Sequence, residues 1–296
     1  MADVDLTGLG VALATPFQKN LKVDYQALER LLDHVVEGGV DYIVVLGTTA
    51  ETPTLSTVEK NEISRFIRSK VNDRIPLVLG LGGNNTMGVV KEIETRDLDG
   101  YSALLSVAPY YNKPSQEGLF QHFKTICDAS PLSIILYNVP SRTGVNITPV
   151  TVRKLAEYSG KICGIKEASG NMEQCEDLIK KAPAGFSVIS GNDGDTYSLM
   201  KLGGKGVISV LANAFPKEMK KLVTLCRNKK YMEALSFQQS LSKIITGLFE
   251  EGNPSGVKAV LAQLGIMENY LRLPLVPVSK NVEFKLKKEI EVLLKK

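Results

Sequence analysis

The chain has 296 residues, enough for one large hydrophobic core or two small ones. Its 36 basic and 32 acidic residues are evenly spread apart from a lysine-rich tail, so we do not expect nucleic-acid binding. Its four cysteines and two histidines lack zinc-ligand spacing, so we expect no metal site and interpret the cysteines as buried thiols of a reducing compartment. No secretory pattern and no membrane-length apolar stretch is visible, so we expect a cytoplasmic protein with no membrane partner.

Eight short apolar runs follow one another along the chain, rich in Val, Ile and Leu and without polar alternation. Such runs are typical of parallel strands that are covered on both faces. They begin roughly 20 to 35 residues apart, about the length of one βα unit. The predicted strands are Gly10–Ala14, Tyr42–Leu46, Pro76–Leu81, Ala103–Ala108, Ser133–Tyr137, Cys163–Ile165, Phe186–Ser190 and Gly206–Leu211.

The segments between these runs have helical periodicity. Tyr25–Glu37 places its leucines at three- and four-residue intervals and ends before two glycines. Thr57–Val71 follows Ser56, a suitable N-cap residue. Further helices are predicted at Ser115–Asp128 and Thr148–Tyr158, the second with a proline in its first turn.

Eight βα units within residues 1–225 predict an α/β fold, a closed (β/α)8 barrel. The pattern alone leaves a doubly wound open sheet as the alternative. Residues 226–296 are predicted to form a C-terminal helical extension, too thin to be counted as an independent domain. The predicted helices in and before it are Pro216–Arg227, Tyr231–Glu250, Ser255–Leu264 and Val282–Lys296.

Lys166 is the first candidate for chemistry, because barrel enzymes place their active sites at the C-terminal ends of the strands. Strand side chains alternate, so Lys166 and Glu167 should face opposite sides. Desolvation inside a barrel favours the neutral amine, which attacks ketones to form a Schiff base. A lysine that extends to solvent or pairs with a carboxylate is the structural alternative.

Other strand ends carry polar side chains as well. Tyr137 could shuttle protons, Thr48 and Thr49 could bind a small carboxylate, and the guanidinium of Arg142 could hold a second carboxylate. Each residue taken alone is also compatible with a bland structural role: a half-buried core tyrosine, a strand-ending turn, or a surface arginine.

Four segments taken in order narrow these alternatives. They are Gly47-Thr48-Thr49-Ala50-Glu51, Pro109-Tyr110-Tyr111-Asn112-Lys113-Pro114, Tyr137-Asn138-Val139-Pro140-Ser141-Arg142-Thr143-Gly144 and Gly164-Ile165-Lys166-Glu167-Ala168. Together they resemble the dihydrodipicolinate synthase family of pyruvate-dependent class I aldolases, in which N-acetylneuraminate lyase is a relative. The resemblance extends from Gly10 to the Leu271-Arg272-Leu273-Pro274 segment.

The resemblance implies a role for each matching residue. Lys166 would form the imine with pyruvate, and Tyr137 would relay protons during its formation. Thr48 would link this tyrosine to Tyr111, which in the family reaches into the neighbouring subunit's active site.

The remaining matching positions would bind substrate. Thr49 would contribute to the pyruvate carboxylate site, and Arg142 would receive the carboxylate of the second substrate. Gly191 and Ile208 match positions that line the pocket through main-chain atoms.

The activity so implied is condensation of pyruvate with L-aspartate 4-semialdehyde in lysine biosynthesis by a homotetramer, with no cofactor. Alternatives are another pyruvate aldolase, such as N-acetylneuraminate lyase or a 2-keto-3-deoxy sugar acid aldolase, and a catalytically silent barrel. The Ser141-Arg142-Thr143-Gly144 run favours a short aldehyde with a carboxylate over a long sugar.

The chain departs from the family's pattern in two places. Ala50 stands where glycine is usual, which would cost roughly 1 kcal/mol if the position required a positive φ. The positions that bind inhibitory lysine in other members carry Thr57, Lys60 and Gly88 instead of histidines and a glutamate. We therefore expect weak or absent inhibition by lysine.

Overall fold

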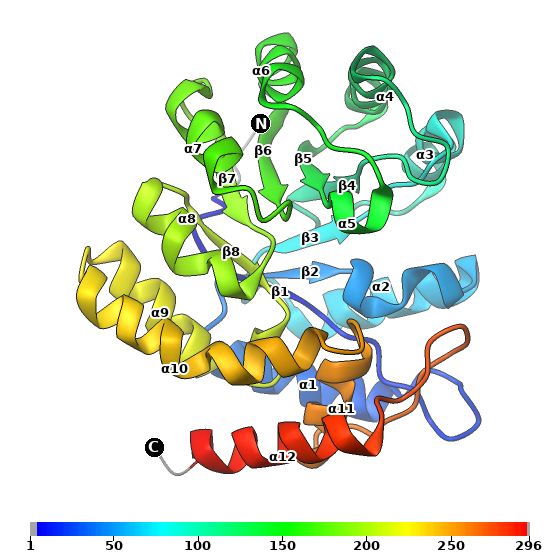
Figure 1. The fold of residues 1–296 in the computed structure, drawn as a ribbon. Helices are drawn as coiled ribbons and strands as arrows, with labels where there is room; N and C mark the ends of the chain where they lie inside the picture. The colour runs from blue at the N-terminus through cyan, green and yellow to red at the C-terminus, as the bar shows by residue number, and fades with distance from the viewer. Residues whose placement is uncertain (1–4, 295–296) are drawn as a thin grey trace.

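Eight parallel strands close into a barrel in the computed structural model, which describes residues 5–294 (Figure 1). The first strand pairs with the last, so the predicted (β/α)8 barrel is confirmed and the open sheet is excluded. The strands are β1 (Gly8–Ala12), β2 (Tyr42–Val45), β3 (Leu77–Gly80), β4 (Ala103–Val107), β5 (Ser133–Asn138), β6 (Ile162–Glu167), β7 (Ser187–Ser190) and β8 (Gly206–Ser209).

Each predicted strand overlaps one observed strand, and the differences lie at the ends. β6 extends through Lys166 and Glu167, beyond the apolar run that predicted it, because the backbone of these two residues continues the ladder to β5. β1 ends at Ala12, two residues earlier than predicted. Beyond it, the Ala14 N–H donates to the side chain of Asn213 at 3.0 Å.

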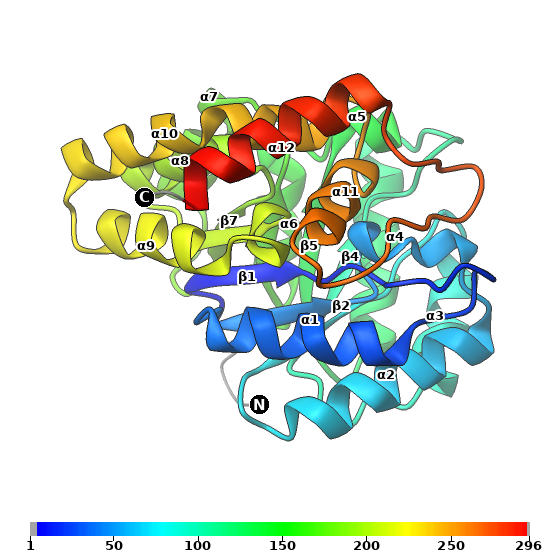
Figure 2. The same ribbon diagram turned by 90° about the horizontal axis from the view of Figure 1, so that it is seen from below.

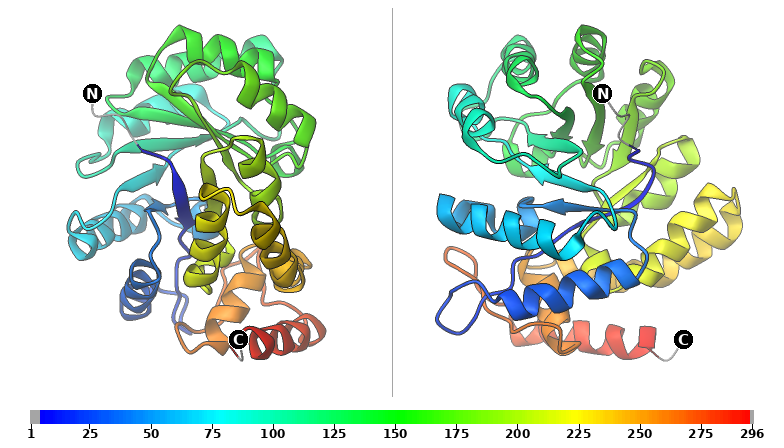
Figure 3. Two further views of the ribbon diagram at one scale, coloured as in Figure 1. Left: turned by 90° about the vertical axis from the view of Figure 1, so that its left-hand side faces the viewer. Right: turned by 180° about the vertical axis from the view of Figure 1, so that it is seen from behind.

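Helices surround the strands on all sides (Figures 1 and 3). They are α1 (Tyr25–Glu37), α2 (Thr57–Val71), α3 (Thr86–Thr95), α4 (Gln116–Ala129), α5 (Pro140–Thr143), α6 (Pro149–Tyr158), α7 (Met172–Lys181), α8 (Thr196–Leu202), α9 (Pro216–Arg227), α10 (Tyr231–Phe249), α11 (Ser255–Gln263) and α12 (Lys280–Leu294).

The helix starts follow the capping residues in the sequence. Ser56 and Glu59 form a reciprocal capping box at α2, and Thr148 caps α6 one residue before Pro149. No bounds were predicted for α3, α5, α7 and α8, because short helices give little periodic signal; α7 buries only Cys175 and Leu178.

The side chains divide into two hydrophobic layers. Alternate strand residues point into the barrel, and the others pack beneath the helices. Tyr42 fills the barrel interior opposite Gly10, where an added Cβ would lie 2.3 Å from the tyrosine ring. A glycine is therefore required beside this bulky side chain.

The C-terminal helices form a layer outside the barrel (Figure 2). α10 packs on α8 and α9, and α11 and α12 pack on each other and on α10. The predicted helix Val282–Lys296 corresponds to α12, and its residues 295–296 lie outside the described residues. The domain boundary near residue 225 stays a prediction. Within residues 5–294, no helix combines the length and apolarity needed to cross a membrane.

His122 on α4 provides a pH-dependent test of the packing. Its ring is buried, with Nδ1 2.9 Å from the Thr86 hydroxyl oxygen, and burial lowers its pKa from 6.5 to about 4. Between these two values the unfolded chain binds more protons than the folded one, so stability is present above pH 6.5 and is lost as the pH falls.

We therefore expect the free energy of unfolding to fall by about 2 kcal/mol between pH 7 and pH 5 because of this residue alone. Urea unfolding at the two pH values, compared with a His122→Gln variant that cannot titrate, measures this contribution. An equal pH dependence in both proteins would contradict it.

Candidate functional site

A cavity of about 450 Å³ opens at the C-terminal ends of the barrel strands. It is lined by residues from several strand ends and from the loops that follow them, and it also receives Phe249 and Asn253 from the C-terminal extension. Six of the eight predicted site residues line it: Thr48, Thr49, Tyr137, Arg142, Lys166 and Gly191.

Lys166 and Tyr137 lie side by side on adjacent strands. They are direct partners in the β5–β6 register, and the lysine Nζ lies 4.5 Å from the centroid of the tyrosine ring. Both side chains are buried and point into the barrel. The arrangement offers a shielded amine with an aromatic hydroxyl group on the neighbouring strand, a combination that suits imine chemistry.

Glu167 points the opposite way, as strand alternation predicts. Its carboxylate accepts hydrogen bonds from Asn138 Nδ2 at 3.0 and 3.1 Å, from Gln174 Nε2 at 2.9 Å and from the Ser169 N–H at 2.7 Å. Asn138 is its register partner on β5. This buried carboxylate is fully hydrogen-bonded and fixes the ends of the two strands that carry Lys166 and Tyr137.

The two threonines lie in a 3₁₀ turn, Thr48–Ala50, that directly follows β2. The first N–H groups of such a turn have no partner within it, so they and the threonine hydroxyls could receive a small carboxylate. The turn is braced by the Thr52 hydroxyl, which donates to the carbonyl oxygens of Leu46 and Gly47 at 2.9 and 2.8 Å.

Ala50 has no positive φ, so the substitution of the usual glycine carries no left-handed strain. The left-handed residue of this loop is Glu51, with φ 56°. Its side chain is buried and points away from the cavity, toward Lys258 of the C-terminal extension.

Arg142 lies on the short helix α5 at the rim of the cavity. Its guanidinium donates to the main-chain oxygen of Asn253 at 3.3 Å, and its side chain remains exposed. One edge of the guanidinium group is thus hydrogen-bonded to the protein and the other faces solvent, where it can bind the carboxylate of an entering substrate.

Gly191 and Ile208 differ in position. Gly191 lines the cavity and donates its N–H to Glu167 O at 2.7 Å, and an added Cβ would lie 2.6 Å from the Cβ of Ala168. Ile208 lies fully buried in the barrel interior and is not among the residues that line the cavity.

Tyr111 does not reach this cavity. Its side chain is 85% exposed and its backbone has φ 74°. Tyr110 lines the cavity instead. A role for Tyr111 in catalysis therefore requires another subunit, and its assignment stays a prediction.

Asp193 is a buried acid behind the cavity. Burial raises its pKa, and hydrogen bonds from Ser209 and from the N–H groups of Leu211 and Val210, together with the charge of Lys166, oppose the change. Its Oδ2 accepts the two N–H groups at 3.1 Å (Val210) and 3.0 Å (Leu211) and so fixes the turn after β8.

Sequence reasoning missed two residues of the extension. Asn253 Nδ2 donates to the hydroxyl oxygen of Thr49 at 3.0 Å. Lys258 is fully buried outside the cavity, where burial lowers its pKa to about 8 although Glu51 acts in the other direction. Its position as the one charged residue of the predicted helix Ser255–Leu264 is the signal that could have identified it.

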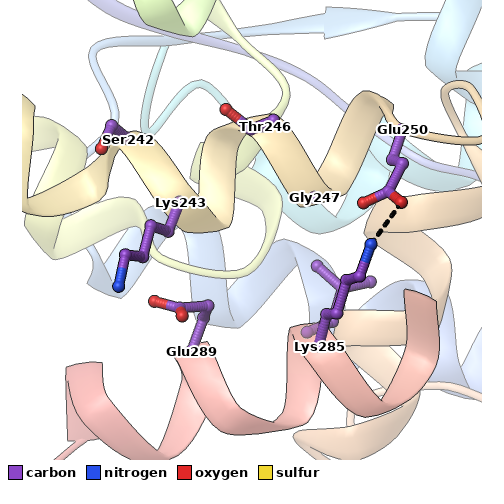
Figure 4. A pocket seen from close by; sticks show the side chains of 8 residues that line it. Ser242, Lys243, Thr246, Gly247, Glu250, Lys285 and Glu289 are labelled. Carbon is purple, nitrogen blue, oxygen red and sulfur yellow. Dashed lines mark hydrogen bonds and ion pairs between the residues drawn. The ribbon is translucent and has the colours of Figure 1, made fainter. Parts of the chain in front are cut away.

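A second hollow of about 300 Å³ lies between α10 and α12 (Figure 4). The side chains of Lys243 and Glu289 extend into the space between the helices, and Lys285 pairs with Glu250 at 2.6 Å. A hollow lined by charged side chains and one partly exposed ion pair resembles an ordinary helix–helix surface, so we place the candidate site in the barrel.

Comparisons with known proteins show similarity over nearly the whole chain. The model of the dihydrodipicolinate synthetase family matches residues 5–293. The 4-hydroxy-tetrahydrodipicolinate synthase of Parabacteroides distasonis is 52% identical over 277 residues, 94% of this chain and 93% of that protein.

Solved structures with the same fold include the dihydrodipicolinate synthase of Aquifex aeolicus, with a TM-score of 0.94, 39% identity and 98% of each chain covered. A structure of the Cyanidioschyzon merolae enzyme with lysine bound matches with a TM-score of 0.92 and 35% identity, over 96% of this chain and 97% of that one.

Proposed function

Because the chain belongs to the dihydrodipicolinate synthetase family, we propose that it condenses pyruvate with L-aspartate 4-semialdehyde in lysine biosynthesis. The observation that carries this proposal is the buried pair of Lys166 and Tyr137, 4.5 Å apart between amine and ring centroid, beneath a rim that holds Arg142. The proposed reaction needs an amine, a proton relay and two places for carboxylates.

The first half-reaction takes place at Lys166. Its neutral amine attacks the ketone carbon of pyruvate, and loss of water leaves a protonated imine. Tyr137 moves protons to and from the carbinolamine oxygen, and the Thr48–Thr49 turn holds the pyruvate carboxylate. The imine withdraws electrons, so a methyl proton is lost and an enamine forms.

The second half-reaction uses the cavity rim. The enamine carbon attacks the aldehyde of the semialdehyde, whose carboxylate binds to Arg142. The amino group of the same substrate then attacks the imine carbon, releases Lys166 and closes the ring. Gly191, which lines the cavity, is proposed to contribute main-chain contacts to the substrates. The same role for Ile208 rests on the family resemblance alone.

We propose further that the enzyme is a cytoplasmic homotetramer in which Tyr111 completes a neighbour's site. Two observations support the proposal: this tyrosine is exposed, and it is not among the residues that line the cavity. The link through Thr48 in the family resemblance supports it as well. The four cysteines form no disulfide bond in the described residues, which suits a reducing compartment.

Reductive trapping tests the proposed chemistry. Borohydride added with pyruvate should leave one covalent adduct, on Lys166, when peptides are identified by mass spectrometry. A Lys166→Arg variant should lose the adduct and at least about 10⁴-fold in turnover, because it removes the nucleophile itself. Lys60→Gln, which changes another lysine of the cavity lining, should keep the adduct.

A separate experiment tests which second substrate the enzyme uses. Turnover with pyruvate and L-aspartate 4-semialdehyde should greatly exceed cleavage of N-acetylneuraminate. A preference for the sugar acid would identify another pyruvate aldolase, and absence of any adduct would identify a catalytically silent barrel.

Lysine should inhibit this enzyme weakly or not at all. Lys60 lines the cavity rim together with Pro53 and Tyr110, and no acidic side chain stands at Gly88. Repulsion between two ammonium groups about 4 Å apart costs on the order of 1–4 kcal/mol, which corresponds to roughly one to three decades in affinity.

Initial rates with and without millimolar L-lysine measure this effect. We expect the rates to agree within about twofold, and a Lys60→His variant, which removes the fixed charge, to be the more sensitive protein. Strong inhibition of the unmodified enzyme would show that lysine binds despite Lys60.

A further inference from the structure

Glu51 and Lys258 form a fully buried ion pair outside the cavity. The lysine Nζ lies 2.5 Å from Glu51 Oε1, both side chains have no exposed surface, and the same Nζ donates to Tyr270 O at 3.0 Å. The ammonium also lies 4.1 Å from the centroid of the Phe17 ring. Lys258 therefore joins α11 of the extension to the loop after β2.

Glu51 ends the turn that carries Thr48 and Thr49. A non-glycine residue in the left-handed region costs about 1–2 kcal/mol and persists only where its surroundings hold it. Here the holding contacts come from the extension, since the Arg272 N–H donates to Glu51 Oε2 at 3.0 Å in addition to the contact with Lys258.

A buried ion pair is a poor way to gain stability. Removing two charges from water costs as much as their attraction returns, so an apolar or neutral pair of the same shape is often equally stable. What the charged pair provides is a defined position, because either partner left alone would be a buried, unpaired charge.

Asn253 makes a second connection to the same turn. Its side-chain amide donates to the Thr49 hydroxyl at 3.0 Å, and its main-chain oxygen accepts from Arg142 at 3.3 Å. The extension thus contacts the two cavity elements that offer places for carboxylates, the Thr48–Thr49 turn and Arg142.

We propose that Lys258 and Asn253 are positioning residues, which hold the Thr48–Thr49 turn in the geometry that imine formation at Lys166 requires. The proposal rests on the proposed function, since pyruvate is the substrate that the turn would orient. It makes the C-terminal extension a working part of the active site, although Lys258 and Glu51 touch no substrate.

The test is a paired neutralisation, Glu51→Gln with Lys258→Met. The glutamine keeps an acceptor for the Arg272 N–H, and neither residue leaves an unpaired charge. The matched control is Asp41→Asn with Lys220→Met, which neutralises a 2.6 Å pair where Asp41 also accepts from a backbone N–H, that of Leu9.

Three measurements are made on each full-length protein: the urea midpoint, the rate of borohydride trapping with pyruvate, and hydrogen exchange of peptides spanning residues 46–55. The Glu51/Lys258 double variant should unfold near the parental urea concentration. Its trapping rate should fall about 10- to 100-fold and its KM for pyruvate should rise, since small misplacements of binding groups have effects of this size. The turn should exchange faster, and the control should match the parent in trapping and in exchange.

Unchanged trapping and exchange in the folded double variant would overturn the proposal. If that variant does not fold, Asn253→Ala decides, because it removes only the bond to Thr49; parental trapping and exchange would again overturn the proposal. A parent protein that forms no pyruvate adduct would instead refute the proposed function, and the exchange comparison would still test the positioning of the turn.

Discussion

The register between β5 and β6 is the constraint on which the rest of the site depends. It pairs Tyr137 with Lys166 and, one residue further, Asn138 with Glu167. Because alternate residues face opposite sides, the first pair points into the cavity and the second into the surrounding layer, where the Glu167 carboxylate receives its hydrogen bonds. If β6 slipped by one residue so that Glu167 paired with Tyr137, the carboxylate would point into the cavity and the amine of Lys166 would point toward the helices.

The two buried lysines illustrate how differently one side chain can be used. Lys166 lines an open cavity beside an aromatic ring and is available to a substrate. Lys258 is enclosed by Glu51, Tyr270 O and Phe17, and its lowered pKa reflects burial in a structural network. Access to a cavity therefore separates the candidate nucleophile from the positioning residue.

The sequence predicted the barrel because eight apolar runs and capped helices such as Thr57–Val71 are local patterns. Local alternation also predicted that Lys166 and Glu167 face opposite sides, although it did not decide which of the two faces the cavity. The contacts of Asn253 and Lys258 did not follow from local patterns, because they join residues about 200 positions apart and depend on how the extension packs. The sequence also did not predict that Ala50 has an ordinary backbone conformation and Glu51 a left-handed one. The contacts that hold Glu51, with Lys258 and Arg272, are long-range and cannot be read from the local sequence.

The central claim is that Lys166, held beside Tyr137 by the β5–β6 register, is the amine that binds pyruvate. A crystal structure of the enzyme soaked with pyruvate tests it most directly. The account predicts continuous electron density from Lys166 Nζ to the ketone carbon, with the pyruvate carboxylate against the Thr48–Thr49 turn. Pyruvate bound in the cavity without a bond to Lys166, or joined to another lysine such as Lys258, would contradict it.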